Sequence, residues 1–104
     1  MKKIMLVCSA GMSTSLLVTK MKTASDEMNL EVDVFAVAEA DAKNHYERAD
    51  IVLLGPQVRF LKDKIEKEVK DYAIPVAVID SISYGMMDGK KVLESALDSL
   101  KLKN

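Results

Sequence analysis

The sequence is poor in the residues that build several common kinds of site. It has one cysteine, one histidine and no tryptophan among 104 residues. A single cysteine excludes an internal disulfide and a cysteine-based metal cluster, and a single histidine argues against a zinc site. Lys and Arg number 15 against 16 Asp and Glu, so the basic excess typical of nucleic-acid-binding proteins is missing. We therefore expect no metal site and no nucleic-acid partner.

The composition predicts one globular domain that covers residues 1–104. Hydrophobic residues make up 49% and charged residues 30%, which is ordinary for a globular domain. No apolar run approaches the roughly 20 residues that span a bilayer, so we expect no direct membrane insertion. The apolar stretch after Met1 ends at Cys8 and does not resemble a signal peptide. We expect a cytoplasmic protein that needs no cofactor, with a monomer as the default.

Four short segments predict β-strands. Residues 3–8 and 50–54 are almost continuously apolar, as in strands that are buried on both faces. Residues 31–37 begin by alternating valines with acidic residues, which predicts a half-exposed edge strand. Residues 75–79 predict the last strand, with Pro75 at its first position, where a missing N–H is tolerated.

A helical segment or a loop follows each predicted strand. Residues 38–47 are rich in alanine and acidic residues and predict a short helix. Residues 81–89 predict a loop, with Asp88 as the cap of the last helix. The other three helices are indicated by apolar residues at helical spacing. These are Leu17, Met21, Ala24 and Met28; then Val58, Leu61, Ile65 and Val69; then Val92, Leu93, Ala96, Leu97 and Leu100.

The alternation of strands and helices predicts an α/β fold. It should contain a single open four-stranded parallel sheet with helices on both faces. Right-handed crossovers leave few topologies, and the simplest strand order is 2-1-3-4. Ligands bind such sheets beyond the carboxyl ends of the strands, where the strand order reverses. That edge should carry Cys8, Gln57 and Tyr84, which follow three different strands.

Cys8 ends the first predicted strand and precedes a segment suited to binding an anion. Glycine there allows successive backbone N–H groups to turn inward, and the helix that follows presents its N-terminus. The same donors would favour the nucleophilic thiolate form of Cys8, although a buried structural cysteine is the alternative interpretation. The predicted phosphate-binding loop consists of Ser9, Ala10, Gly11, Met12, Ser13, Thr14 and Ser15.

Three further features carry weaker signals. Residues 85–91 resemble a Walker A loop, but the spacing is one residue short and no Ser or Thr follows the lysine. We interpret them as a turn and a helix start. His45 lies in a polar segment and is predicted to be a solvated surface residue. The methionines Met12, Met86 and Met87 fit either a partner-docking surface or core filling.

Three motifs resemble the IIB components of bacterial sugar phosphotransferase systems (PTS), in the lactose/cellobiose/chitobiose branch. They are C-S-A-G-M-S-T-S from Cys8, D-I-V-L-L-G-P-Q up to Gln57, and V-I-D-S-I-S-Y-G-M-M-D-G up to Gly89. The resemblance covers essentially the whole chain, with these motifs in the same order. The resemblance implies the four-stranded architecture of low-molecular-weight tyrosine phosphatases. It also implies that Cys8 takes a phosphoryl group from a phosphohistidine of the IIA component. The acceptor would be a sugar held by the membrane IIC component, such as cellobiose or chitobiose, and the sequence leaves that sugar open.

This resemblance places the partner-docking surface at the mouth of the crevice around Cys8. Because the chain has one thiol, the same surface would meet both partners in turn. The predicted docking residues are Met12, Gln57, Ser83, Tyr84, Met86 and Met87.

Two other functions remain open on the residues alone. A low-molecular-weight tyrosine phosphatase needs C-x5-R, and Thr14 occupies the arginine position here. It also needs an Asp-Pro general acid, whereas both prolines follow other residues, Gly55 and Ile74. A flavodoxin-like FMN-binding module would suit the hydroxyl-rich loop, but the chain is short and only 5% aromatic. The phosphotransferase component is therefore the favoured hypothesis.

Overall fold

The computed structural model describes residues 1–9 and 11–103, with side chains for residues 1–9 and 14–100. Its central feature is a four-stranded sheet in the order β2-β1-β3-β4, in which each neighbouring pair is parallel. The predicted α/β class and the strand order 2-1-3-4 are confirmed. The strands are β1 (Lys2–Cys8), β2 (Val32–Ala38), β3 (Ile51–Leu54) and β4 (Val76–Val78).

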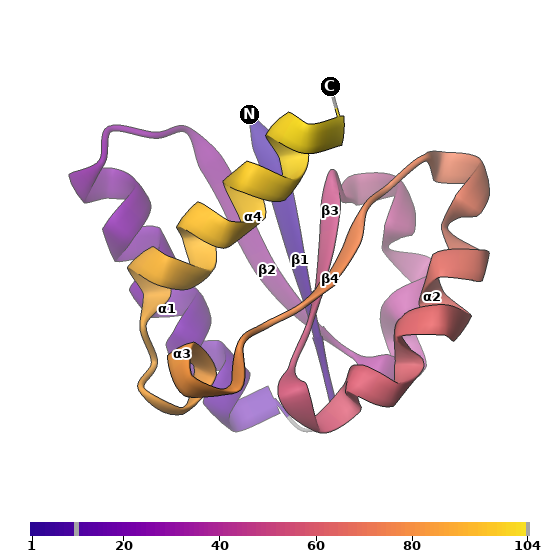
Figure 1. Ribbon diagram of the computed structural model, residues 1–104. Helices are drawn as coiled ribbons and strands as arrows, with labels where there is room; N and C mark the ends of the chain where they lie inside the picture. The colour runs from indigo at the N-terminus through magenta and orange to yellow at the C-terminus, as the bar shows by residue number, and fades with distance from the viewer. Residues whose placement is uncertain (10, 104) are drawn as a thin grey trace.

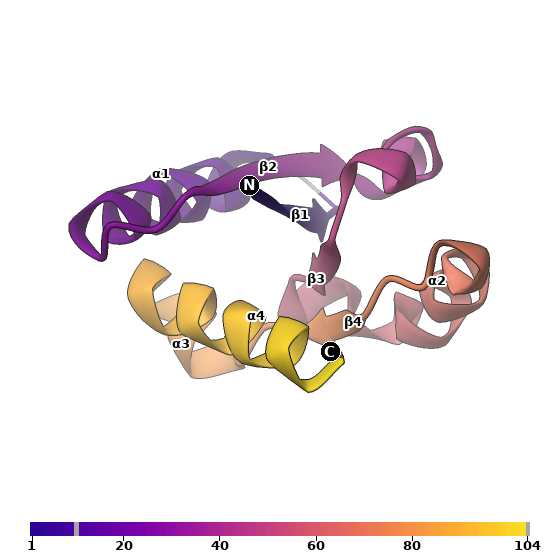
Figure 2. The same ribbon diagram turned by 90° about the horizontal axis from the view of Figure 1, so that it is seen from above.

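Helices cover both faces of the sheet (Figure 1, Figure 2). One face carries α1 (Gly11–Glu27) and α4 (Gly89–Lys103), with the short helix α3 (Ser81–Gly85) beside them. The opposite face carries α2 (Lys62–Glu68) together with short 3-10 helices. These are η1 (Glu39–Asn44), η2 (Tyr46–Arg48), η3 (Pro56–Leu61) and η4 (Lys70–Tyr72).

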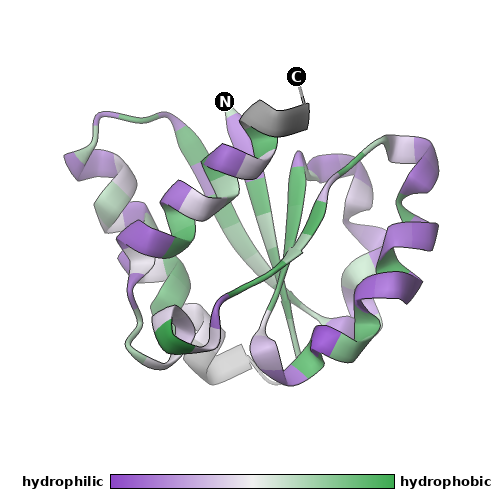
Figure 3. Ribbon diagram, viewed as in Figure 1, coloured by the Kyte–Doolittle hydropathy of each residue, from purple (hydrophilic) through white to green (hydrophobic). Residues whose placement is uncertain are grey.

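The central strand β1 supplies side chains to a separate hydrophobic core on each face. Because successive side chains of a strand point to opposite faces, Ile4 and Leu6 join the core under α1 and α4. Met5 and Val7 join the core under α2. All four side chains are at most 1% exposed, as the continuous apolar sequence predicted. Figure 3 shows the same arrangement, with hydrophobic strands between helices whose outer faces are hydrophilic.

The helices α1 and α4 are in close contact at Gly89. A Cβ atom on residue 89 would lie 2.5 Å from the backbone carbonyl carbon of Lys20 and 2.6 Å from the backbone nitrogen of Met21. Glycine therefore allows the start of α4 to lie directly against α1. The same contact brings Leu93 of α4 into one core with Leu17 of α1.

Three segments differ from the expected secondary structure. Residues 38–47 form η1 and part of η2 in place of an α-helix, with bonds such as His45 N–H to the Ala42 carbonyl at 3.0 Å. Residues 56–61 also form a 3-10 helix before α2 begins, interrupted by the non-helical backbone of Val58. Short connecting segments commonly take this tighter form. The predicted loop at residues 81–89 contains α3.

The end of that segment agrees with the sequence interpretation. Asp88 caps α4, because its carboxylate accepts a hydrogen bond from the Lys91 backbone N–H at 3.1 Å. Met87, just before it, has a φ of 54° and turns the chain between α3 and α4. The Walker-like run is therefore a turn and a helix start, as expected.

Candidate functional site

Cys8 is the last residue of β1, at the edge where all strands of the sheet end. Its Cα is paired with that of Ala38 at the end of β2. On the other side, the Gly55 N–H donates to the Val7 carbonyl at 3.1 Å and holds the turn after β3 beside it. In the sheet, β2 lies on one side of β1, and the chain then crosses to β3 on the other side. The strand order reverses at β1, so Cys8 lies at the switch point of the sheet.

The thiol of Cys8 is covered rather than open to the crevice. The side chain is 1% exposed, and its Sγ–H points to the Val37 carbonyl oxygen, with Sγ and that oxygen 3.9 Å apart. This differs from the expectation that the thiol lies free at the crevice mouth. A reacting group reaches the sulfur only after part of this cover moves aside.

The segment after Cys8 leads directly into α1, which begins at Gly11 and is 17 residues long. The first turn of such a helix has backbone N–H groups without a helical partner and carries the positive end of the helix dipole. These donors lie at the same edge as Cys8. Within the predicted phosphate loop, Ala10 lies outside the described residues, as do the side chains of Gly11, Met12 and Ser13. The exposed Ser9 and Ser15 flank them.

The hydroxyl of Tyr84 joins three segments at this edge. Its Oη lies 3.3 Å from Oγ1 of Thr14 in the first turns of α1. It also accepts a hydrogen bond from Nε2 of Gln57, after β3, at 3.1 Å. Thr14 is 1% exposed, Tyr84 is half-buried and Gln57 is exposed. The bridge therefore runs from the surface to the buried start of α1.

Gly55 provides the space that Gln57 needs. A Cβ atom on residue 55 would lie 2.6 Å from Oε1 of Gln57. Glycine at this position lets the Gln57 side chain fold back over its own turn and reach Tyr84. The motif G-P-Q is thus explained by the geometry of the bridge.

The predicted docking residues differ in how much surface they offer. Gln57 is exposed and Met86 is 72% exposed, whereas Met87 is half-buried and packs against the core under α1 and α4. Ser83 is 8% exposed, and its hydroxyl donates to Asp80 at 3.2 Å. Its place at the site is structural, because it belongs to the cap of α3 and offers little surface to a partner.

Asp80 forms that cap at the end of β4. Its carboxylate accepts the Ser83 backbone N–H at 2.9 Å. This hydrogen bond is the main reason that the pKa of Asp80 lies below its ordinary value, and the Ser83 hydroxyl, the Ile82 backbone and Lys91 act in the same direction. The ionised cap holds α3, and with it Tyr84, at the edge of the sheet.

Two exposed apolar side chains at the same edge were not predicted from the sequence. Phe60 is 73% exposed in η3, three residues after Gln57. Ile82 is 71% exposed and lies one turn before Met86 in α3. The sequence signal that could have found them is an apolar residue close to a predicted site residue, at a position that faces solvent. Large exposed apolar groups of this kind are typical of binding surfaces.

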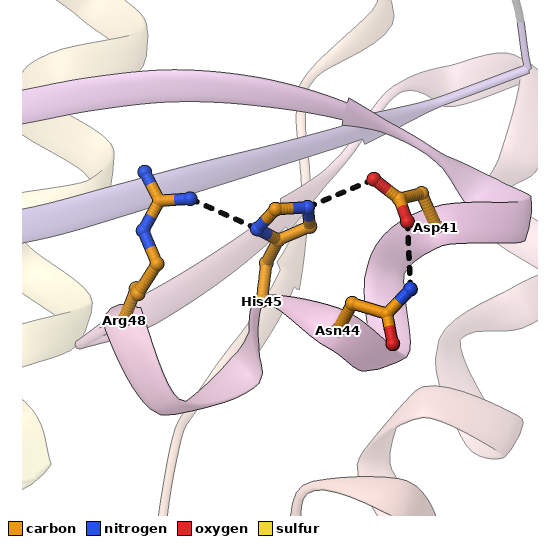
Figure 4. A network of polar contacts seen from close by, with 4 residues as sticks. All are labelled: Asp41, Asn44, His45 and Arg48. Carbon is orange, nitrogen blue, oxygen red and sulfur yellow. Dashed lines mark hydrogen bonds and ion pairs between the residues drawn. The ribbon is translucent and has the colours of Figure 1, made fainter.

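His45 lies in a network of polar contacts and is not a freely solvated residue (Figure 4). Its Nε2 is 2.8 Å from Asp41 Oδ2, and its Nδ1 is 2.9 Å from the Arg48 guanidinium. The Arg48 guanidinium lies over the Phe35 ring at 4.4 Å, and His45 meets the same ring edge-on. The hydrogen bond from Asn44 is the main reason that the pKa of Asp41 is lowered, with His45 second. The residue therefore has a structural place between η1, η2 and β2.

The described residues were also compared with the requirements of a metal site and of a membrane span. They contain no group of three or more His, Cys, Asp or Glu side chains that could hold a metal ion. Within the same ranges, no helix has the length and the apolar character that a membrane crossing requires.

Comparison with known proteins identifies the family. The profile of "PTS system, Lactose/Cellobiose specific IIB subunit" matches residues 3–95. The chain is 54% identical over 97 residues to the oligo-beta-mannoside-specific EIIB component of Bacillus subtilis (strain 168), covering 93% of this chain and 94% of that protein. It is 44% identical over 100 residues to the galactose-specific EIIB component of Lactococcus lactis subsp. cremoris (strain MG1363), covering 91% and 93%. The solution structure of a cellobiose-specific IIB component from Borrelia burgdorferi aligns with a TM-score of 0.81 and 40% identity, covering 99% and 94%. The chain therefore belongs to the lactose/cellobiose-specific IIB subunit family of the sugar phosphotransferase system.

Proposed function

We propose that this protein relays phosphoryl groups from a IIA component to a sugar, with Cys8 as the carrier. The observation that carries the proposal is the position of Cys8, which is the only thiol of the chain. It lies at the switch point of the sheet, three residues before the N-terminus of a 17-residue helix. Such a helix end favours a bound phosphoryl group.

The relay consists of two transfers that conserve the phosphoryl group. First, the Cys8 thiolate attacks the phosphorus of a phosphohistidine on IIA, so an S–P bond forms, the N–P bond breaks and the freed imidazole takes up a proton. Then a sugar hydroxyl held by IIC attacks the same phosphorus. An O–P bond forms, the S–P bond breaks, the hydroxyl proton leaves to solvent or to a base of the partner, and the thiolate returns. No cofactor takes part.

The Tyr84 bridge supplies a neutral donor to the phosphoryl group. Because Gln57 donates to Tyr84, the Tyr84 O–H is left to donate to Thr14, and the Thr14 O–H can turn to a phosphoryl oxygen. Thr14 stands where a phosphatase of this architecture has a cationic arginine. Neutral donors hold the phosphocysteine without the charge that would speed its hydrolysis, and a relay requires that its intermediate survives until the sugar arrives.

The docking face lies around the Tyr84 bridge. A transferring group must come within about 3–3.5 Å of the sulfur, so each partner must cover this edge and displace the cover of Cys8. The exposed side chains available there are those of Gln57, Phe60, Ile82 and Met86, with Tyr84 between them. We include Met12 because it belongs to the first turn of α1, at the edge that carries Cys8. A small, partly apolar face suits a transient complex.

We propose a β-linked oligosaccharide, such as cellobiose or chitobiose, as the acceptor. Two of the three similar proteins are named for β-linked sugars, an oligo-beta-mannoside and cellobiose. The third is named for galactose, so transport assays with each sugar are needed to choose among them.

The experiment that tests the relay follows the phosphoryl group by mass spectrometry. The protein is incubated with phosphoenolpyruvate and the general PTS proteins, with and without IIA. The wild type should gain one phosphoryl group only when IIA is present, and peptide mapping should place it on Cys8. Cys8→Ser should fold normally and stay unlabelled, while the control His45→Gln should label like the wild type. Label on Cys8→Ser, or on His45, would overturn the proposal.

A further inference from the structure

A cavity lies on the face of the sheet opposite α1 and α4. It has a volume of about 200 Å³, lies between η1 and α2 and is partly open to solvent. None of its lining residues belongs to the Cys8 site. The floor is apolar and buried, and it consists of Ala42, Leu61, Ile65 and the ring of Tyr46. The rim consists of Glu39, Lys43, Lys64 and Glu68, with Ala40 at the mouth.

One wall of this cavity is fixed by a buried hydrogen bond. The Tyr46 hydroxyl donates to Oε1 of Glu68 at 2.7 Å. Burial and the neighbouring Glu68 raise the pKa of Tyr46, so the phenol keeps its proton. The other oxygen of Glu68, Oε2, has a long ion pair of 3.6 Å with Lys43 Nζ, and the Lys43 side chain is 71% exposed. Oε2 can therefore accept a further hydrogen bond from a ligand.

The charges of the rim select the kind of ligand. Two carboxylates face two ammonium groups, so their formal charges cancel and neither an anion nor a cation is favoured overall. Carboxylates only accept hydrogen bonds and ammonium groups only donate them. A ligand matches the whole rim when each of its polar groups can do both, and hydroxyl groups have this property.

The size and the floor restrict the ligand further. The volume corresponds to about seven water molecules of about 30 Å³ each, which is less than the drug-sized pockets of roughly 300 Å³ and above. The apolar floor, with its aromatic ring, suits the C–H face of a saturated ring. We propose that this cavity binds a neutral polyhydroxyl molecule about the size of one sugar ring. The proposal does not depend on the phosphoryl relay.

Titration followed by amide NMR shifts tests this site. The probes are glucose, mannose, cellobiose and glucose 6-phosphate, each added up to tens of millimolar. Glucose or mannose should cause saturable shifts centred on η1 and α2. Binding by cellobiose as well would show that the mouth admits a second ring. No saturable shift with any neutral sugar, shifts centred on the Cys8 edge, or binding by glucose 6-phosphate alone would overturn the proposal.

Two variants and two controls sharpen the result. Glu68→Gln keeps an acceptor for Tyr46 but removes the charge, and it should weaken sugar binding about tenfold through the loss of a charge-assisted hydrogen bond. Glu66→Gln lies exposed on the same helix outside the cavity and should leave binding unchanged. Ala40→Phe, at an exposed position, should fill the mouth and abolish binding. Unchanged binding in Ala40→Phe would place the sugar elsewhere. Cys8→Ser should bind sugar like the wild type, whatever the outcome for the relay.

Discussion

Tyr84 shows how one hydroxyl can organise residues that are far apart in the sequence. It contacts Thr14 and Gln57, which lie 70 and 27 residues away along the chain. The three residues follow three different strands, so the parallel sheet alone places them at one edge. The hydroxyl then fixes the turn after β3 against the start of α1. A change at Tyr84 should therefore affect transfer more than stability.

Tyr84→Phe removes this hydroxyl and keeps the ring. We expect phosphoryl transfer from IIA to slow by about tenfold, which corresponds to the loss of roughly one hydrogen bond in the transition state. The thermal midpoint should change little, because the ring remains half-buried. Quenched-flow labelling of Cys8 measures the rate. Tyr72→Phe, on η4 and 46% exposed, is the matched control and should transfer like the wild type. Equal transfer rates for Tyr84→Phe and Tyr72→Phe would show that the Tyr84 bridge takes no part in phosphoryl transfer.

His45 should exist as a single tautomer. The Arg48 guanidinium can only donate, so Nδ1 of His45, at 2.9 Å from it, must accept. The ring hydrogen is then on Nε2 and is donated to Asp41. Long-range ¹H–¹⁵N NMR at neutral pH should show a protonated Nε2 and an unprotonated Nδ1. In Arg48→Gln the preference for this tautomer should weaken, and a hydrogen on Nδ1 in the wild type would contradict the network.

The sequence could place the site residues but not their contacts. Cys8 ends a predicted strand, and Gln57 and Tyr84 follow two others. Because parallel strands end at the same edge, the sequence predicted that all three residues lie at that edge. The Tyr84 bridge and the cover over Cys8 depend on rotamers in three connecting segments, which no periodicity encodes. His45 was misjudged for the same reason, because its partners Asp41, Arg48 and Phe35 are set by the tight 3-10 turns.

The contact between α1 and α4 depends on the absence of a side chain at one position. Gly89→Ala would place a Cβ within 2.6 Å of two backbone atoms of α1, and backbone cannot move aside as a flexible side chain does. We expect the free energy of unfolding to fall by about 1–3 kcal/mol, the usual cost of overpacking. Urea unfolding measures it. Gly85→Ala, in α3, meets no atom within 4 Å and should be neutral or slightly stabilising. Equal changes in the free energy of unfolding for Gly89→Ala and Gly85→Ala would mean that α1 and α4 can move apart at no cost.

The Asp80 cap gives α3 a pH dependence on the acid side. Because folding lowers the pKa of Asp80, its contribution is complete above the ordinary aspartate range and is lost as the pH falls through the lowered value. Asp80→Asn can still cap but cannot titrate. Its unfolding free energy should therefore fall less steeply than that of the wild type on acidification. Urea unfolding across this range checks it, with the exposed Asp71→Asn as a control that keeps the wild-type slope.

Among the elements, strands were predicted well and the short helices were not. The continuous apolar runs predicted the bounds of β1 and β3 to within one residue, because a strand that is buried on both faces is apolar throughout. The segment at residues 38–47 contains residues suited to an α-helix, but Ala42 and Tyr46 are its only well-buried side chains before Arg48. Two buried side chains make too narrow an apolar face to stabilise an α-helix. The segment therefore forms the short 3-10 helices that connect β2 to β3. Helix α3 was missed because its five residues are too few to show a period.

For the molecule as a whole, a relay on Cys8 as the single thiol would require that its two partners take turns. If IIA and IIC both cover the face around Gln57, Tyr84 and Met86, they cannot bind together. A pull-down on immobilised IIC should lose this protein as unphosphorylated IIA is added. Met86→Asp should weaken both complexes about equally, with little change in the thermal midpoint, because the side chain is 72% exposed. A stable ternary complex would show that the two faces are separate.

The two cores differ in when they can be completed during synthesis. The buried residues of the core under α2 run from Met5 to Val69, so all of them precede α4 in the chain. The other core joins Ile4 and Leu6 to Leu93 and Ala96 of α4, which are synthesised later. That core therefore stays incomplete on the ribosome until α4 has been made, with only α1 packed against this side of β1. A chain that stops before α4 would leave that apolar surface open to aggregation.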